Sequence, residues 1–321
     1  METQKFFFEI VKNRLSPNLR LADVVGDVLS VGSDSAYRRI RGEKELTLNE
    51  TAKLCRYFDI SLDSVINLRS DNIPFKYTPL DLKDMNNYYT YMKGLAALFD
   101  SIAKSGEKEI CFMAIDIPVA HFTPFLELTL FKIYTWFQSI NNLQVTYDRF
   151  VSGLDIPFLV DIYAAIDNAY KQIPSTEIWT NSTLDPLLHL IDYYFDMNCF
   201  EKKETADLIG YQLYRLIENM EKYAGKEEKA KAIPFRMYLS PIDLMNDFMI
   251  SKRDGITVTS IKLYTINGIF TSNEFFCSEV EKWMQNTVSK SLRLSGASEK
   301  ERYKFFQNLK NKTNYLLEKF R

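Results

Sequence analysis

Hydrophobic positions recur mainly at the helical period along this chain, and the clearest example lies near its start. Between residues 21 and 29 the apolar residues fall at i, i+4, i+7 and i+8, which places them on one face of an amphipathic helix. These residues are Leu21, Val25, Val28 and Leu29. Gly32 follows them, and we expect it to be a left-handed glycine that closes the helix. Ser33 or Asp34 can then cap a second short helix.

The second helix, expected over residues 33–42, has an apolar face and a polar face. Ala36 and Ile40 are four residues apart and should pack inward together. Arg39 falls between the two faces, so the spacing leaves its orientation open. The residues expected on the outward faces are Ser33, Ser35, Tyr37, Arg38 and Arg41.

Further helical signals complete a small domain over residues 1–70. Thr47 and Glu50 have the spacing of a capping box, which predicts a helix N-terminus at this point. The pattern predicts another helix over residues 6–15 and a short helical turn capped at Ser61–Ser64. The residues expected on the buried side of the helix after Thr47 are Leu48, Ala52, Cys55 and Phe58, with Leu54 beside them. The sequence therefore predicts five short helices in an all-α domain.

The chain after residue 70 predicts a second domain of mixed structure. Polar residues mark a linker over 71–82, and residues 83–321 combine amphipathic helices with fewer strand signals. A buried strand is expected over Glu109–Ile117 and an alternating strand over Ile256–Ile266, after the turn dipeptide Asp254-Gly255. The helices are expected over residues 84–104, 123–140, 154–172, 184–197, 203–224, 273–292 and 298–320. The fold class is mainly α with a smaller β part: an all-α helix-turn-helix domain followed by an α+β regulatory domain.

Two segments of this second domain leave a choice between interpretations. The helix over 84–104 has apolar residues at heptad spacing, so it either packs inside its own domain, which we favour, or forms a dimer seam. The run from Ala224 to Lys229 is strongly charged and is expected to be a turn in solvent. His189 lies among leucines and isoleucines, which favours a buried structural role.

Residues 18–68 resemble the lambda-repressor/Cro-like helix-turn-helix family, most closely its BetR-type branch. The family's second helix usually ends in Trp-Glu-x-Gly, whereas this chain has Arg39-Ile40-Arg41-Gly42 and so lacks the Trp and the Glu. The resemblance covers about a sixth of the chain. It is carried by Leu21-Ala22, Val31-Gly32-Ser33, Ala36-Tyr37-Arg38-Arg39-Ile40-Arg41-Gly42-Glu43, Leu46-Thr47 and Phe58-Asp59-Ile60-Ser61-Leu62-Asp63.

The resemblance and the arginines together imply a transcription regulator that binds double-stranded DNA with helix 33–42 in the major groove. One such module makes few contacts, so a homodimer is expected. The residues expected to contact DNA are Ser33, Ser35, Tyr37, Arg38, Arg41 and Lys44. The alternative is a protein-interaction adaptor that uses the helix-turn-helix fold without binding DNA.

Composition excludes little but supports a cytoplasmic protein. The net charge is −2, and the four cysteines are widely spaced in apolar runs, which indicates reduced core residues. The start of the chain lacks a secretory pattern, and no apolar run is long enough to span a membrane, so no membrane partner is expected. Neither histidine has metal-ligand spacing, and no phosphate loop or nucleophile motif occurs. We therefore expect no catalytic residues, metal or cofactor, and a second domain that dimerises and senses a small-molecule or protein effector.

Overall fold

The fold is described from a computed structural model that covers residues 2–15, 19–58, 60, 62, 65, 73–80, 83–141 and 145–320. The chain divides into two compact units, Met1–Phe75 and Lys76–Arg321, and each unit is described by itself. No helix in these ranges is both long enough and apolar enough to cross a membrane.

In the described part of the first unit, every regular element is a helix. These helices are α1 (Glu2–Asn13), α2 (Leu21–Leu29), α3 (Ser33–Ile40) and α4 (Leu48–Tyr57). Their apolar faces meet in one core around Phe7, Val11, Val25, Ala36 and Leu54, all of which are almost completely buried. Helix α2 packs against both α3 and α4, so the helix-turn-helix pair is fixed by the same core.

The turn between α2 and α3 differs from the expectation. Ser30, not Gly32, adopts the left-handed conformation, with φ of 57°. Gly32 has extended backbone (φ −63°, ψ 155°) and is itself the N-cap of α3, so Ser33 is the first helical residue. The prediction assigned the positive φ to the glycine because glycine adopts it without steric cost. The backbone N–H of Ser30 donates to the Asp27 carbonyl, which closes α2 earlier than predicted.

Among the predictions for the helix ends and faces of the first unit, one is confirmed and two are wrong. The capping box is confirmed, since Thr47 and Glu50 exchange both of its hydrogen bonds. Helix α3 ends at Ile40, two residues earlier than predicted, because Gly42 has φ of +77° and cannot continue it. Leu48 was expected to be buried but is 76% exposed, while Leu54 occupies the centre of the core.

Several expectations fall wholly or partly outside the described residues. They are most of the turn Ser61–Ser64, the domain boundary at residue 70, and residues 71, 72, 81 and 82 of the linker. Within the described part of that linker, Lys76–Tyr77 forms a short strand, β1, which pairs with β8 of the second unit.

The second unit is built on a mixed sheet, which counts nine strands in the described residues. The strand order is β1-β8-β7-β6-β2-β3-β5-β4, and β9 pairs with β5. Strands β2, β3 and β5 are parallel, and the other pairings are antiparallel. The strands after β1 are β2 (Lys108–Met113), β3 (Ser175–Trp179), β4 (Glu228–Ala230), β5 (Ile233–Leu239), β6 (Phe248–Arg253), β7 (Ile256–Lys262), β8 (Gly268–Thr271) and β9 (Leu292–Arg293).

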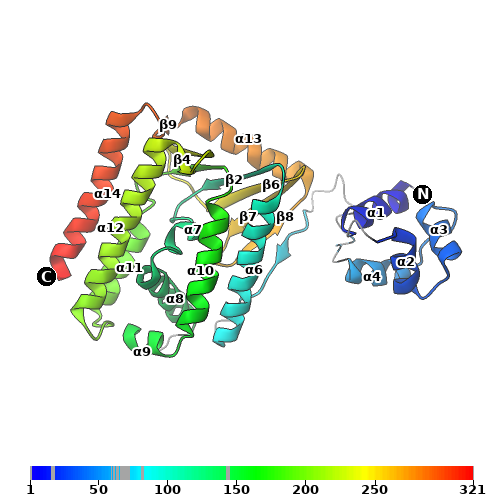
Figure 1. Ribbon diagram of the computed structural model, residues 1–321, viewed down its shortest axis with the longest axis horizontal. Coiled ribbons are helices and arrows are strands. Elements are labelled where there is room, and N and C mark those ends of the chain that lie inside the picture. The colour runs from blue at the N-terminus through cyan, green and yellow to red at the C-terminus, as the bar shows by residue number, and fades with distance from the viewer. Residues whose placement is uncertain are drawn as a thin grey trace. The chain divides into compact units, whose positions relative to one another are not determined.

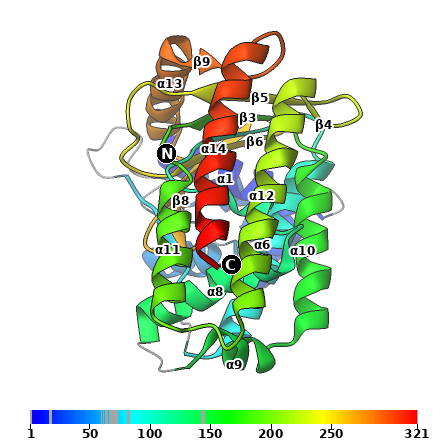
Figure 2. The same ribbon diagram turned by 90° about the vertical axis from the view of Figure 1, so that its left-hand side faces the viewer.

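Helices cover both faces of this sheet, but very unequally. In the described part of the second unit, α13 is the one helix on one face, and α6, α8, α10 and α12 lie on the other, with α14 packed outside α12 (Figures 1 and 2). The helices of this unit are α6 (Met85–Lys104), α7 (Val119–Phe122), α8 (Leu126–Asn141), α9 (Tyr147–Ser152), α10 (Ile156–Tyr170), α11 (Asp185–Asp196), α12 (Lys203–Lys226), α13 (Glu274–Lys290) and α14 (Glu299–Phe320).

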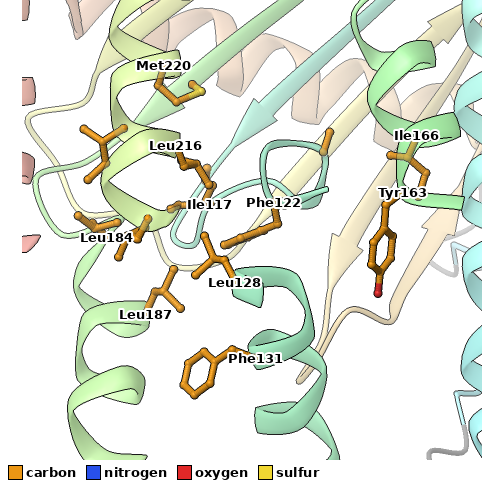
Figure 3. Close-up of a cluster of buried hydrophobic side chains, with 14 of the residues drawn as sticks. Ile117, Phe122, Leu128, Phe131, Tyr163, Ile166, Leu184, Leu187, Leu216 and Met220 are labelled. Atoms are coloured by element: carbon orange, nitrogen blue, oxygen red, sulfur yellow. The ribbon is translucent and has the colours of Figure 1, made fainter. Parts of the chain in front are cut away.

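Alternation along the strands divides the apolar residues between two cores. On β2, Ile110 and Phe112 point to the large core under α6, α10 and α12, and Met113 points to a small core with Val280 and Met284 of α13. Figure 3 shows part of the large core, where Leu128 and Phe131 of α8 lie near Leu187 of α11 and Leu216 of α12.

The fold class is therefore mainly α with a smaller β part, as predicted, and most predicted helices agree with observed ones. Helix α6 packs against α10 inside its own unit, which was the favoured interpretation of the heptad pattern. The turn Asp254-Gly255 joins β6 to β7, with positive φ at both residues. The other strands β1, β3, β4, β5, β8 and β9 were not predicted.

Two polar side chains of the second unit are placed differently from the expectation. Helix α12 continues to Lys226, and Lys229 is only 7% exposed, although residues 224–229 were expected to be a solvated turn. Its amino group donates to the Tyr170 carbonyl and lies over the Tyr170 ring, and burial lowers the pKa of Lys229 to about 7. His189 is exposed, because it lies on the outer face of α11.

Candidate nucleic-acid interface

Helix α3 turns one face to the core of the first unit and the other to solvent. Ala36 is completely buried, and Ile40 is partly buried four residues later. Tyr37 and Arg38 follow Ala36 on the opposite side, where they are exposed. The periodicity that predicted these faces is therefore confirmed at the centre of the helix.

Arg39, whose orientation the sequence left open, points inward and is only 3% exposed. One guanidinium nitrogen donates to Glu50 Oε1 at 2.6 Å, and another donates to the carbonyl and the hydroxyl of Ser35. The hydrogen bond from Arg39 holds the pKa of Glu50 below its usual range, against the opposing effect of burial. Arg39 therefore ties α3 to the start of α4 and is not available to a ligand.

The Glu50 side chain takes part both in the ion pair with Arg39 and in the capping box of α4. Its Oε1 accepts from Arg39, while its Oε2 accepts from the backbone N–H of Thr47 in the capping box. The carboxylate thus caps α4 and compensates the charge of a buried arginine. A buried guanidinium requires such a partner, because an unpaired charge in this position would be strongly destabilising.

The two arginines that point outward share one carboxylate. Arg38 and Arg41 have side chains that are 55% and 60% exposed, and both lie within 4.0 Å of the Glu43 carboxylate, at 3.9 and 3.5 Å. Exposed ion pairs of this kind contribute at most about 1 kcal/mol. The guanidinium groups are consequently free to exchange Glu43 for a stronger anionic partner.

The loop that follows α3 is held in place from α1. The Gln4 amide donates to the carbonyls of Arg39 and Lys44, and its oxygen accepts from the N–H of Leu46. The positive φ of Gly42 turns the chain between these contacts, so the backbone around Arg41 and Lys44 has a defined path.

The structure leaves most of the predicted contact residues accessible. Ser35 is the exception, since it is half-buried and its hydroxyl accepts from Arg39. Arg41 is the C-cap of α3, and Lys44 lies in the loop beyond it. The residues of the predicted set that are exposed are Ser33, Tyr37, Arg38, Arg41 and Lys44.

Sequence reasoning missed three residues that shape this surface. Gln4 was not assigned any role, Glu43 was quoted only for the family resemblance, and Glu50 was identified only as part of the capping box. The spacing of Glu43 after Arg38 and Arg41 was a usable signal. Gln4 carried none, because its partners lie 35 to 42 residues away.

The accessible groups define the chemistry of the surface. Two guanidiniums, an ammonium, a phenol and a hydroxyl are hydrogen-bond donors on or just after one short helix. A guanidinium can form paired hydrogen bonds to phosphate oxygens or to the O6 and N7 atoms of guanine. The surface is therefore suited to an anionic partner with regularly placed acceptors.

Comparison of the chain with protein-family models, with curated proteins and with solved structures finds no match. The likeness to the lambda-repressor/Cro-like family thus rests on the residues quoted above.

Proposed function

We propose that this chain is a cytoplasmic DNA-binding transcription regulator whose helix α3 enters the major groove of its operator. The observation that carries the proposal is the division of the three arginines of this segment. Arg39 is buried and fixes α3 to α4, while Arg38 and Arg41 are exposed on the far side. A helix-turn-helix presents side chains to base edges in this way: its second helix is anchored on one side and has hydrogen-bond donors on the other.

Some of the accessible residues would contact base edges, and others would contact the DNA backbone. Arg38 and Arg41 are the candidates for paired contacts with guanine or phosphate. Ser33 begins α3, Tyr37 lies on its exposed side, and Lys44 lies in the loop that follows it, where neutral or single-point donors suit phosphate oxygens. Ser35 contributes indirectly, because its hydroxyl helps to hold Arg39.

In this proposal the second unit would form the dimer and bind the effector. A single helix-turn-helix makes few base contacts, so a homodimer on a two-fold-related site is the expected binding form. An effector, either a small molecule or a protein, would then act by changing how two DNA-reading helices are held relative to each other.

The test is selection of bound duplexes from a random-sequence DNA library by the full chain, followed by binding of the selected duplex. We expect the double variant Arg38→Ala/Arg41→Ala to lose its preference for the selected duplex over unrelated DNA. The matched control is Arg56→Ala, which removes an exposed arginine from α4 and should keep that preference. Equal binding by the double variant and the original chain would contradict the role of α3.

The second candidate is a protein-interaction adaptor that uses the same unit. The observation in its favour is Leu48, whose apolar side chain is 76% exposed at the start of α4. An adaptor would show no salt-dependent affinity for duplex DNA, which distinguishes it from a regulator.

A further inference from the structure

The second unit contains a large, half-open cavity between α6 and one face of the sheet. Its volume is about 730 Å³, and it is lined mostly by apolar side chains. Tyr91, Leu95 and Leu98 of α6 form one wall, and Met249 of β6 and Phe270 of β8 belong to the opposite wall. A cavity of this size and lining is typical of small-molecule sites.

The lining of the cavity runs along β6. Asp247, which precedes the strand, and Phe248, Met249, Ser251 and Arg253 of β6 all line it, so the lining reaches from the start of this strand to its last residue. Six residues of extended strand correspond to about 20 Å. The space is therefore suited to a molecule with a long apolar body.

Charged groups line the two ends of the cavity, but they are balanced at only one of them. Near the start of β6, Asp116 accepts from Lys132 at 2.8 Å and from Lys262 at 3.0 Å, and Lys262 also pairs with Asp247. Two carboxylates and two ammoniums thus neutralise each other. The lysine pairs hold the pKa of Asp116 well below its usual range, against the effect of burial.

At the other end, Arg253 has no carboxylate within ion-pair distance in the described part of the chain. Its guanidinium donates to the Ser101 hydroxyl at 2.6 Å, which leaves further N–H donors available. The nearest acid along the chain, Asp254, accepts from the backbone N–H groups of Gly106 and Glu107. Lys108 lies opposite Arg253 in the sheet register and donates to the Ala103 carbonyl, but it is not part of the lining, so among the described lining residues Arg253 is the charged side chain at this end.

We propose that this cavity binds an amphipathic monoanion, a carboxylate with a long apolar body, whose carboxylate pairs with Arg253. The lining has three cations (Lys132, Lys262 and Arg253) and two anions (Asp116 and Asp247), which leaves one positive charge for the ligand to neutralise. A planar carboxylate matches the fork of a guanidinium, and the apolar body gains by leaving water along β6.

All residues that line the cavity belong to the second unit, so ligand binding there is independent of DNA binding by the first unit. The cavity's role as the effector site rests on the proposed function. Ligand binding is therefore measured without DNA. A failure to bind the ligand would not contradict DNA binding by the first unit, and a failure to bind DNA would not contradict the ligand site.

Gly94 offers a way to fill the cavity without disturbing the fold. It lies on α6 and lines the cavity, and a Cβ added at this position meets no atom within 4 Å. Gly94→Phe would place a ring in the cavity. The glycine is in the middle of a helix, where most other residues are better tolerated.

The experiment is calorimetric titration of the full chain with decanoate, decanol and acetate. We expect one decanoate per chain, with much weaker binding of decanol, which lacks the charge, and of acetate, which lacks the apolar body. Arg253→Met should weaken decanoate binding by about tenfold or more, and Gly94→Phe should weaken it while the variant remains folded by circular dichroism.

The matched control is Arg236→Met, which removes an exposed arginine of β5 outside the cavity lining and should leave decanoate binding unchanged. Absence of decanoate binding would overturn the proposal. Equal affinity for decanoate and decanol, or an Arg253→Met variant that binds as tightly as the original chain, would overturn the assignment of the anion to Arg253.

Discussion

Single side chains decide what the first unit presents to a partner. Arg38, Arg39 and Arg41 have the same chemistry but different partners, since Glu50 holds Arg39 inside while Glu43 pairs loosely with the other two. The buried pair is a structural element, whereas the exposed pairs are weak enough to be exchanged. Two carboxylates therefore determine which arginines are structural and which are accessible.

Replacing Glu50 with alanine should destabilise the first unit. The change leaves the buried Arg39 charge without its carboxylate and removes half of the capping box, so we expect a loss of about 3 kcal/mol in the free energy of unfolding. Urea unfolding followed by circular dichroism measures it, with Glu45→Ala as the exposed control. Equal stability of Glu50→Ala and Glu45→Ala would contradict this role of Arg39.

The same pair predicts sensitivity to acid. Because the folded pKa of Glu50 lies below the ordinary value of 4.5, its contribution is fully present above pH 4.5 and is lost as the pH falls through the folded value. Unfolding measured at pH 7 and pH 3 should therefore show a smaller difference between Glu50→Ala and the original chain at pH 3. A difference that does not change with pH would argue against the ion pair.

Glu43 should oppose DNA binding, since it neutralises Arg38 and Arg41 and would lie near phosphates. We expect Glu43→Gln to raise the affinity of the full chain for duplex DNA by about threefold or more at low salt. Fluorescence anisotropy measures the affinity, with Glu45→Gln as the neighbouring control. A decrease, or an equal rise in the control, would contradict the placement of Glu43 at the interface.

Lys229 should make stability depend on pH in the alkaline range. Its pKa is about 7 in the folded chain and 10.5 when unperturbed, so between these values the unfolded chain binds more protons and stability rises with pH. The rise from this group is at most about 1.4 kcal/mol per pH unit. Urea unfolding at pH 7 and pH 9.5 should show this rise in the original chain and in the exposed control Lys231→Met, and a smaller rise in Lys229→Met. An unchanged rise in Lys229→Met would contradict the burial of a neutral lysine.

Individual elements show where local pattern is sufficient to predict the fold. The outward face of α3 and the long helices were predictable because apolar residues recur at the helical period. Strand β3 was not, because it begins Ser175-Thr176-Glu177 and so has no apolar run, although Glu177 at its centre is completely buried. His121, Tyr170 and Trp179 hydrogen-bond to this carboxylate, and His121 lies 56 residues away, so no local pattern could identify it.

In the candidate site, too, local pattern predicted the exposed residues but not the contacts between distant residues. Periodicity identified the accessible residues of α3, but the partner of Arg39 lies eleven residues away on another helix, and the sequence therefore left Arg39 undecided. The left-handed residue of the turn was misplaced because propensity favours glycine there, whereas Ser30 adopts that conformation.

Two glycines should respond in opposite directions to substitution by alanine. Gly94 is in the middle of α6 with open space around it, so Gly94→Ala should stabilise the second unit by about 0.5–1 kcal/mol. Gly42 has φ of +77°, so Gly42→Ala should destabilise the first unit by about 1–2 kcal/mol. Urea unfolding measures both, and changes of the same sign would contradict the backbone description of one of them.

At the scale of the whole molecule, the chain combines two units with separate cores and separate candidate sites. The first unit offers donors suited to an anionic polymer, and the second has a cavity suited to a small amphipathic anion. A regulator that responds to an effector needs both a site that reads DNA and a site that receives the signal. This pairing of sites is what the proposed function explains.

The most direct test of the central claim is the salt dependence of binding to a duplex selected by the full chain. The account predicts that the logarithm of the binding constant falls linearly with the logarithm of the salt concentration, because Arg38, Arg41 and their neighbours displace counterions from phosphates. It also predicts weaker binding to unrelated duplex at every salt concentration. A binding constant that does not change with salt concentration, or the absence of any preferred duplex, would contradict the account and favour an adaptor.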